Sequence, residues 1–477
     1  MDAKVRSFIR TFVKEIRESN AAIFAGAGLS RPAGYVDWKE LLREVAEDLG
    51  LDVDKETDLI SLAQYHVNEH GRGKINQILL DQFTKDSVVT DNHRILAQLP
   101  IDTYWTTNYD NMIEKALETF GKKVDVKRTP VSLATTLQGR DATVYKMHGD
   151  IALPEEAVLA RDDYERYNDK RKQYTLTLQG DLMQKTFLFI GFSFDDPNLH
   201  YILSRIRVLL GENQRNHYCF MKQVERTDYE TEEDYHYATI KQELRVKDLK
   251  RFSINVLLVE KYSDITDILR TVAAKVKQHN VFVSGSATDF GSWGEQRVFE
   301  FATNLSKMLI QLEENIVTGF GLGIGSCVIS GALEEIYRNK IHRSEQRLQA
   351  RPFPQQTHGS IPLAELWEQY RREMISQVGL AIFMFGNKPD KDTGEIIEAD
   401  GMVKEFDIAV GFGAVPIPIG ATGFAAETLW KRVMSDFEHY VPDPSLRTLY
   451  EVLGDKSCDE LKLIDTVESI IRRLKER

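Results

Sequence analysis

The sequence has 477 residues, which is too long for one ordinary domain and suggests about two to four. Its hydrophobic share of 42% and aromatic share of 10% exclude extended disorder, and its net charge of −12 argues against nucleic acid or an anionic membrane as the main partner. The three cysteines, Cys219, Cys327 and Cys458, form no Cys-x-x-Cys pair and offer neither a zinc ribbon nor a disulfide framework. Because the N-terminus has no signal-peptide pattern, we expect a soluble, cytoplasmic protein.

The first half of the chain alternates predicted helices with short apolar runs. One helix is predicted over residues 4–18, another starts at Trp38 with Asp37 as its N-cap, and residues 57–98 and 198–247 are rich in helix. The apolar runs, interpreted as buried strands, are residues 21–26, 101–107, 143–147, 186–191 and 251–260. This alternation predicts a doubly wound, Rossmann-like α/β domain with helical insertions.

The same pattern starts again near His279, which predicts a second doubly wound domain. Its strands are predicted at residues 281–286, 315–319, 380–386 and 415–420. Helices are predicted over residues 295–312 and from the end of a glycine-rich loop to about Tyr337, and residues 339–362 are expected to form loops or short helices. We therefore predict two domains, residues 1–279 and residues 280–477.

A glycine-rich loop, Gly26-Ala27-Gly28-Leu29-Ser30, directly follows the first predicted strand. Glycines at such a place let the backbone approach a pyrophosphate, and free N–H groups bind its charge. Small residues after a strand also serve close packing alone, so this loop is weak evidence by itself.

Two polar segments follow later strands of the first half. Asn108 lies in Trp105-Thr106-Thr107-Asn108-Tyr109-Asp110, and His148 lies in Met147-His148-Gly149-Asp150. Ligands of doubly wound sheets bind outside the carboxyl ends of the strands, which is where these segments fall. Taken singly, Asn108 is explained as a helix cap and His148 as a loop or core histidine.

Together and in this order, the three segments resemble the sirtuin family. Residues 34–39, with Gly34 and Asp37, resemble its Gly-Ile-Pro-Asp-Phe-Arg segment, and residues 190–199 fall where sirtuins have a Gly-x-Ser loop. The resemblance implies that Asn108 and His148 are the catalytic pair. It also implies a set of residues along the NAD⁺ cofactor: Ala25, Gly26, Ala27, Gly28, Ser30, Asp37, Thr107, Asp110, Gly191 and Ser193.

One departure from that family narrows the expected reaction. Protein-deacylating sirtuins carry a four-cysteine zinc module, whereas residues 149–280 contain only Cys219, so we expect no metal and cleavage of NAD⁺ to ADP-ribose and nicotinamide. Loss of nicotinamide leaves a ribosyl cation, so the site mainly needs positioning and electrostatic help. Asn108 would orient the ribose or the water, and His148, with an ordinary pKa of about 6.5, would accept a proton. An NAD-dependent protein deacylase and a non-catalytic nucleotide-binding module stay as alternatives.

The second half contains Gly-Phe-Gly-Leu-Gly-Ile-Gly-Ser over residues 319–326, after a predicted strand and before a helix. Such a loop suits a phosphate or ribose at a helix N-terminus, and a flexible turn is the alternative. With residues 281–286, 351–354 and 385–388, it resembles the SLOG family. The chain has no Gly-Gly dipeptide, which the hydrolase members carry, so the resemblance implies a binding and sensing domain.

A zinc-free sirtuin-like domain followed by a SLOG-like domain resembles the effector family of Thoeris antiphage systems. The resemblance implies a homo-oligomer that depletes NAD⁺ when its SLOG domain binds a cyclic ADP-ribose isomer made by a TIR-domain partner. Arginine and lysine would pair with the phosphates and glutamate with ribose hydroxyls. The implied signal-binding residues are Gly285, Ser286, Gly321, Gly323, Arg371, Lys388 and Glu405.

Overall fold

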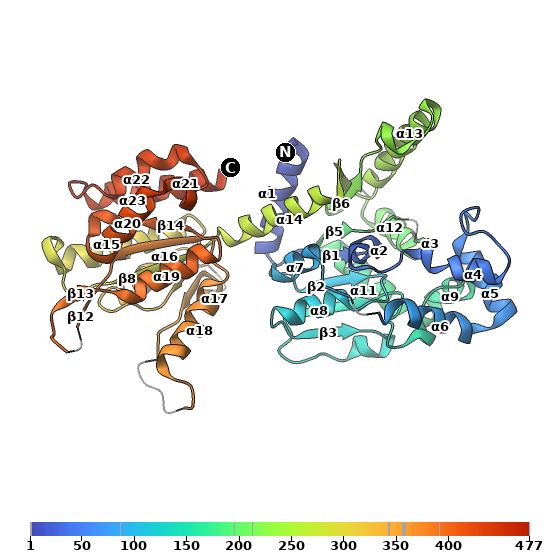
Figure 1. The fold of residues 1–477 in the computed structure, drawn as a ribbon, viewed down its shortest axis with the longest axis horizontal. Coiled ribbons are helices and arrows are strands. Elements are labelled where there is room, and N and C mark those ends of the chain that lie inside the picture. The colour runs from blue at the N-terminus through green and yellow to red at the C-terminus, as the bar shows by residue number, and fades with distance from the viewer. Residues whose placement is uncertain are drawn as a thin grey trace. The chain divides into compact units, whose positions relative to one another are not determined.

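The computed structural model describes residues 2–85, 87–194, 196–211, 213–341, 344–354, 359–390 and 392–476. Its contacts divide the chain into two units, Met1–Ala273 and Ala274–Arg477, which are called unit 1 and unit 2 below (Figure 1). The division falls within helix α14 (Tyr262–Lys277), whereas the sequence places it after residue 279. Each unit has its own parallel sheet and its own apolar core.

Unit 1 is built on a seven-stranded parallel sheet in the order β3-β4-β2-β1-β5-β6-β7. Its strands are β1 (Ala21–Ala25), β2 (Thr103–Thr106), β3 (Val124–Lys127), β4 (Ala142–Lys146), β5 (Thr186–Ile190), β6 (His217–Lys222) and β7 (Ile254–Val259). Every residue of β1, β2 and β5 is buried, as expected for inner strands covered on both faces. The edge strand β3 alternates buried and half-buried residues instead.

The helices of unit 1 flank this sheet and form an insertion beside it. They are α1 (Ala3–Arg17), α2 (Ala27–Ser30), α3 (Trp38–Leu41), α4 (Arg43–Asp48), α5 (Leu59–His70), α6 (Arg72–Phe83), α7 (Asp91–Gln98), α8 (Met112–Thr119), α9 (Arg161–Glu165), α10 (Tyr167–Lys170), α11 (Lys172–Gln184), α12 (Pro197–Leu210) and α13 (Glu232–Lys250). Helices α3 to α6 contribute Leu42, Val45, Leu62 and Leu79 to a second apolar cluster, which also contains Tyr109 and Met112. Burial of these side chains therefore attaches the insertion to the body of unit 1.

Most of the predicted elements of unit 1 are confirmed. Each of the five predicted strands is present, and Asp37 caps α3 by accepting a hydrogen bond of 3.0 Å from Glu40 N. The helix predicted from Trp38 is interrupted at Leu42 and continues as α4. The sequence missed β3, and it missed β6 because residues 198–247 were interpreted as helical.

Unit 2 contains a five-stranded parallel sheet in the order β10-β9-β8-β11-β14, together with a short antiparallel hairpin of β12 and β13. The strands are β8 (Asn280–Ser286), β9 (Asn315–Thr318), β10 (Leu348–Ala350), β11 (Leu380–Phe385), β12 (Asn387–Pro389), β13 (Ile396–Glu398) and β14 (Val415–Pro418). In chain order the large sheet runs 3-2-1-4-5, the arrangement of a Rossmann-like fold. The predicted fold class is confirmed in both units, although strand β10 was expected to be a loop or short helix.

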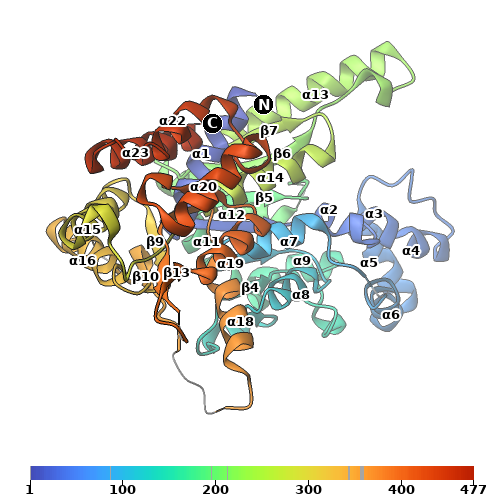
Figure 2. The ribbon, with the colours of Figure 1, turned by 60° about the vertical axis from the view of Figure 1, so that its left-hand side comes forward.

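The helices of unit 2 are α15 (Glu295–Gln311), α16 (Gly325–Arg338), α17 (Ser344–Arg347), α18 (Leu363–Ile375), α19 (Asp400–Gly411), α20 (Phe424–Ser435), α21 (Phe437–Tyr440), α22 (Arg447–Leu453) and α23 (Glu460–Glu476). Figure 2 shows α15 and α16 side by side. In the described part of the chain, no helix is both long and apolar enough to cross a membrane.

Both sheets change direction beside their first strand. In unit 1, β1 lies between β2 and β5, and in unit 2, β8 lies between β9 and β11. The loops at the carboxyl ends of such a pair leave in opposite directions and open a crevice, which is the usual ligand site of this fold class. These two strand edges are therefore where the predicted site residues have to be sought.

Candidate active site and candidate nucleotide site

The register between β2 and β4 places the two predicted catalytic segments next to each other. Thr106 of β2 pairs with Lys146 of β4, and Met147 N donates a hydrogen bond of 2.9 Å to Thr106 O. Asn108 and His148 each follow two residues after the paired positions. Both side chains therefore start from the carboxyl ends of adjacent parallel strands.

Asn108 is buried, with 7% of its surface exposed, and its amide is used on one side only. Its Nδ2 donates to Gly26 O at 3.1 Å and to Ser30 Oγ at 3.2 Å, while its main-chain N–H donates to Thr106 Oγ1 at 2.9 Å. Its Oδ1 is buried and has no hydrogen-bond partner in the structure. A buried amide oxygen without a hydrogen-bond donor lowers the stability of the fold. A bound ligand or water that donates a hydrogen bond to this atom would remove that cost.

His148 is buried as well, with 3% of its surface exposed. Burial lowers the pKa of His148, and the nearby carboxylate of Asp196 partly opposes that shift, so the imidazole is neutral at physiological pH. Asp196 Oδ2 lies 3.1 Å from His148 Nε2, but the two groups are not aligned as a hydrogen bond. The rings of Tyr164 and Tyr167 meet the imidazole edge-on, at centroid distances of 5.6 and 6.1 Å.

Asp196 is a site residue that the sequence reasoning missed. It stands before Pro197 and caps helix α12, where its Oδ1 accepts a hydrogen bond of 2.8 Å from Leu199 N. An aspartate before a proline is fully explained as an N-cap, and this explanation hides its second contact. The segment at residues 190–199 did point to this loop, but only Gly191 and Ser193 were selected from it.

The glycines after β1 and β5 bring these two loops into direct contact. A Cβ on Gly26 would overlap Gly191 O, a Cβ on Gly28 would lie 2.9 Å from Gly191 Cα, and a Cβ on Gly191 would overlap Leu29 N. Gly26 N donates to Ile190 O at 3.0 Å and Gly28 N to Gly191 O at 2.9 Å. The N–H groups of both glycines thus bind within the protein, and close packing is the role that the structure gives them. Phosphate binding by this loop stays a prediction.

Three other predicted residues hold the backbone of the Asn108 loop. Ala25 O accepts hydrogen bonds from Thr106 Oγ1 at 3.0 Å and from Thr107 N at 3.4 Å. Asp110 Oδ1 accepts from Met112 N at 3.0 Å at the start of α8. Ala25, Thr107 and Asp110 therefore lie at the same strand ends as Asn108.

The remaining predicted residues of unit 1 lie in the loops around this pair. Ala27 is the first residue of α2, and Asp37 Oδ2 lies 3.6 Å from an Arg31 nitrogen, next to the end of that short helix. Ser193 O accepts a hydrogen bond from Arg245 of α13. Among the described residues, no group of three or more His, Cys, Asp or Glu side chains is placed to hold a metal ion.

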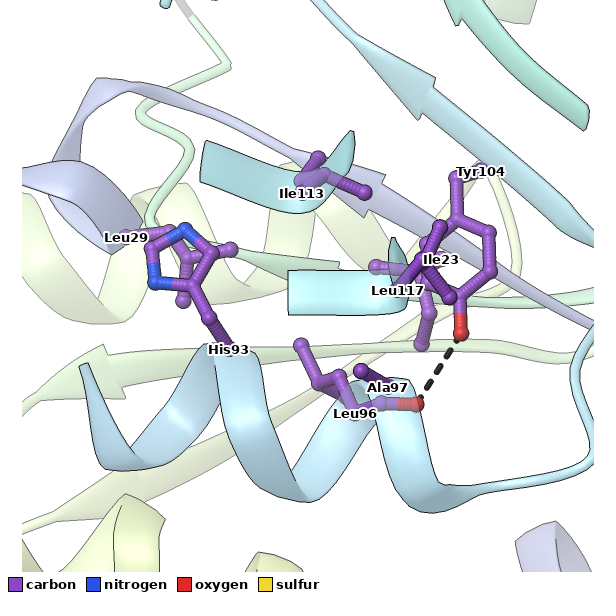
Figure 3. Close-up of a pocket in the computed structure, with 8 residues that line it drawn as sticks. All are labelled: Ile23, Leu29, His93, Leu96, Ala97, Tyr104, Ile113 and Leu117. Carbon is purple, nitrogen blue, oxygen red and sulfur yellow. Dashed lines mark hydrogen bonds between the residues drawn. The ribbon is translucent and has the colours of Figure 1, made fainter. Parts of the chain in front are cut away.

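A small apolar cavity beside the loop after β1 is not the substrate site. Figure 3 shows its lining, with the His93 ring beside Leu29 and the hydroxyl of Tyr104 bonded to Leu96 O. Its volume of about 10 Å³ has room for roughly one water molecule. Burial lowers the pKa of His93 to about 4, so this histidine stays neutral under physiological conditions.

In unit 2, Arg371 and Glu405 form a buried pair at the end of β8. Arg371 Nε lies 3.4 Å from Glu405 Oε1, and Glu405 Oε2 accepts a hydrogen bond of 2.6 Å from Ser284 Oγ. The Arg371 guanidinium stacks over the rings of Phe353 and Trp367, at 4.8 and 5.8 Å from their centroids. Burial raises the pKa of Glu405, and the contacts to Ser284 and Arg371 oppose that shift.

The predicted glycines of unit 2 also serve close packing. A Cβ on Gly321 would overlap Gly285 O, and a Cβ on Gly323, which has φ of +81°, would overlap Ala287 O. The loop after β9 thus lies directly against the end of β8, where Ser286 Oγ donates to Asn387 O at 3.1 Å. The seven predicted residues of this site come from the end of β8, the loop after β9, strand β12 and helices α18 and α19.

At this edge the sequence analysis predicted Lys388 but missed its partner, and it missed the role of Asn387. Lys388 of β12 contacts the carboxylate of Asp400 at the start of α19. Asn387 is fully buried, and its Oδ1 accepts hydrogen bonds from Thr288 N at 2.8 Å and Asp289 N at 2.9 Å. Asn387 therefore fixes the loop after β8, a role that its place in residues 385–388 could have suggested.

The contact between the loops after β1 and β5 predicts a stability difference between two glycine variants. Gly191→Ala forces a Cβ into Leu29 N, so the loops have to separate, whereas Gly139 has a similar φ (+68° against +65°) with nothing within 4 Å of a built Cβ. We expect Gly139→Ala to cost only about 1–2 kcal/mol of unfolding free energy for its backbone conformation, and Gly191→Ala to cost clearly more. Denaturant unfolding of both variants measures this, and equal costs would contradict the packing role.

Comparison with known families agrees with the two halves of the chain. The sequence model of a SIR2-like domain matches residues 102–245. The model of STALD, the Sir2- and TIR-associating SLOG family, matches residues 264–474. The sirtuin-like and SLOG-like resemblances are thereby confirmed.

Curated relatives match over nearly the whole chain. The NAD(+) hydrolase ThsA of Bacillus cereus (strain MSX-D12) is 49% identical over 99% of this chain and 99% of its own length. The NAD(+) hydrolase ThsA of Acinetobacter baumannii (strain 532279) is 48% identical over 97% and 98%, and that of Enterococcus faecium is 44% identical over 100% of both chains. A likeness of this extent leaves one assignment: the chain belongs to the ThsA family of NAD⁺ hydrolases.

Proposed function

We propose that this protein hydrolyses NAD⁺ to ADP-ribose and nicotinamide at the site formed by Asn108 and His148. The relatives with the highest identity quoted above are named NAD(+) hydrolases. The observation that carries the assignment to this site is the Oδ1 of Asn108, which is buried and has no hydrogen-bond partner. Asn108 follows β2, and His148 follows the neighbouring strand β4. A buried polar atom without a partner in the protein calls for an explanation, and at these strand ends a bound ligand or water supplies one.

The reaction breaks the bond between nicotinamide and C1′ of its ribose, and the bonding electrons leave with nicotinamide. A water oxygen then bonds to C1′, and the proton of that water passes to a base and on to solvent. Because Nδ2 of Asn108 is already engaged, its Oδ1 accepts a hydrogen bond from the water or from a ribose hydroxyl and so orients it. Neutral His148 takes the proton from either group, and the Asp196 carboxylate stabilises the resulting imidazolium.

Water is favoured over an acyl-lysine peptide as the acceptor. Tyr164 and Tyr167, from the segment that follows β4, lie edge-on against His148, and the Tyr167 hydroxyl donates to Met147 O at 3.2 Å. These rings cover the imidazole on their side, which leaves less room there for a peptide than for a water molecule. Deacylation of an acyl-lysine peptide added together with NAD⁺ would contradict this preference for water.

We also propose that unit 2 binds a cyclic ADP-ribose isomer and that binding activates hydrolysis. In this structure Arg371 is paired with Glu405 and Lys388 with Asp400. The two phosphates of the signal would replace these carboxylates as partners of the cations, and Glu405 would bind ribose hydroxyls. Activation then requires that the signal bind the active state more tightly than the inactive one.

The biological setting follows from the same proposal. The name of the matching SLOG family associates it with Sir2 and TIR proteins, which supports a TIR-domain partner as the source of the signal. NAD⁺ depletion by a cytoplasmic homo-oligomer would then act in antiphage defence of the Thoeris type. The isomer itself stays open.

The catalytic pair is tested by nicotinamide release from NAD⁺, measured with and without cyclic ADP-ribose isomers. Asn108→Ala and His148→Ala should each lower turnover by about 10²–10⁴-fold, since each removes a group that positions or deprotonates a reactant. Asn68→Ala and His236→Ala change the same residue types at exposed positions of unit 1 and should keep full activity. Full turnover in either site variant, or none in the unaltered protein with every isomer, would refute the proposal.

The pH dependence of hydrolysis tests the contact between Asp196 and His148. The Asp196 carboxylate favours the protonated imidazole and raises the pKa of His148 against the effect of burial. Asp196→Asn, which can still cap α12, should therefore lower that pKa further. A base works when deprotonated, so the acid limb of kcat/KM should move to lower pH. Asp162→Asn, at an exposed position, is the control, and a shift to higher pH would contradict this role.

Neighbouring arginines of α18 give a matched test of the signal site. Arg371→Met removes the buried cation and should raise the isomer concentration for half-activation by about tenfold or more. Arg372→Met removes an exposed arginine that pairs with Glu368 on the same helix and should leave activation unchanged. Titration of nicotinamide release with the activating isomer measures both. An equal effect of the two variants would exclude Arg371 from the site.

A further inference from the structure

Lys146 is a fully buried lysine at the end of β4, two residues before His148. A charged ammonium in such a place is costly unless several acceptors surround it. Its Nζ contacts the main-chain oxygen of Asp110 and lies 3.4 Å from that of Tyr109. It also lies 3.4 Å from a carboxylate oxygen of Glu114 and 3.4 Å from one of Asp150.

These partners connect the ammonium to both catalytic segments. Tyr109 and Asp110 directly follow Asn108, and Asp150 follows two residues after His148. On the other side of Asn108, its main-chain N–H is held by Thr106 Oγ1. The backbone that carries Asn108 is therefore held before the residue by a hydroxyl and after it by an ammonium.

We infer that Lys146 is a positioning residue for the catalytic pair, an assignment that rests on the proposed hydrolysis at Asn108 and His148. Lys146 does not touch the reactants. It holds the two carbonyls after Asn108 and, together with Arg128, pairs with the Asp150 carboxylate after His148, so that the amide oxygen and the imidazole keep their relative placement. The reaction depends on this placement, because an error of about 1 Å in a reacting group costs on the order of 100-fold in rate.

The charge of Lys146 suits this role. Burial by itself would lower the pKa of Lys146, but the carboxylates of Glu114, Asp150 and Asp110 outweigh it and the pKa is raised. The group therefore stays an ammonium with three N–H donors over the whole physiological range. Neutral side chains of similar length cannot serve both carbonyls and both carboxylates at once.

The same sheet contains a comparable ion pair without this connection. Lys127 and Asp125 of β3 are also buried, their Nζ and Oδ2 lie 2.8 Å apart, and Lys127 donates to Thr135 O. In the contacts of the described residues, this pair reaches neither the Asn108 segment nor the His148 segment. It is thus a control for the loss of a buried lysine–carboxylate pair as such.

The test compares Lys146→Met/Glu114→Gln with Lys127→Met/Asp125→Asn in the full-length protein, activated as the unaltered protein requires. Each double variant removes a buried cation together with one carboxylate, so neither leaves that partner charge alone. Nicotinamide release gives kcat and KM, and thermal unfolding gives Tm. In the Lys146 variant we expect kcat to fall by about 10- to 100-fold and KM to change by no more than about threefold. In the Lys127 variant we expect kcat to stay near that of the unaltered protein. The loss of Tm should be similar in the two variants.

A third variant separates the lysine from its carboxylate. Glu114→Gln alone leaves the Lys146 contacts to Tyr109 O and Asp110 O in place, so it should keep most of kcat. Equal kcat in the two double variants, or an equal loss in Glu114→Gln, would overturn the inference while the proposed function stands. Failure of Lys146→Met/Glu114→Gln and of Lys146→Gln/Glu114→Gln to fold would assign Lys146 a structural role only. Absence of turnover in the unaltered protein would refute the proposed function itself, and the inference with it.

Discussion

The parallel register between β2 and β4 is the constraint on which the candidate active site depends. The hydrogen bond from Met147 N to Thr106 O fixes two neighbouring strand ends, and with them the starting points of Asn108 and His148. The loops after β1 and β5 complete this edge because three glycines let them touch. A slip of one residue between β2 and β4 would turn the side chains of one strand to the opposite face, so the relative placement of Asn108 and His148 depends on this register.

Both sites keep polar groups out of water with incomplete or replaceable partners. In unit 1 the amide oxygen of Asn108 has none, and the imidazole of His148 faces a carboxylate without a hydrogen bond. In unit 2 the guanidinium of Arg371 is paired with a carboxylate whose pKa burial has raised. Groups in this condition gain more from a ligand than satisfied groups do, since binding supplies the missing partner. The two candidate sites thus differ: in unit 1 a buried acceptor lacks a partner, and in unit 2 a buried cation is paired within the protein.

The strand ends that carry the candidate sites could be predicted because apolar runs and glycine turns are local signals. The runs that form β1, β2, β4 and β5 are continuous and lead directly into the functional loops, so the order of the segments could be read without the structure. Strand β3 is only four residues long, and its valines alternate with Asp125 and Lys127. Strand β6 lies between two charged helices. Neither strand therefore forms a continuous apolar run that leads into a glycine turn.

Other features depend on contacts between distant parts of the chain. Asp196 was missed because its role as a helix cap explains its place in the sequence, whereas its contact with His148 joins the loops after two different strands. Lys146 and Asn387 were missed for a different reason, since burial of a single polar residue within or beside an apolar run leaves no periodic signal. The glycines were found, but the sequence could not distinguish a loop that binds phosphate from one that packs against its neighbour.

The small exposure of Asn108 and His148 has a kinetic consequence. If a dinucleotide reacts at these two groups, with 7% and 3% of their surface open, the chain around them first has to move aside. The frequency of that opening is then an upper limit on the number of molecules processed per second, however well the catalytic groups are arranged. An effector that only makes opening more frequent would raise the rate without altering a single atom of the chemistry.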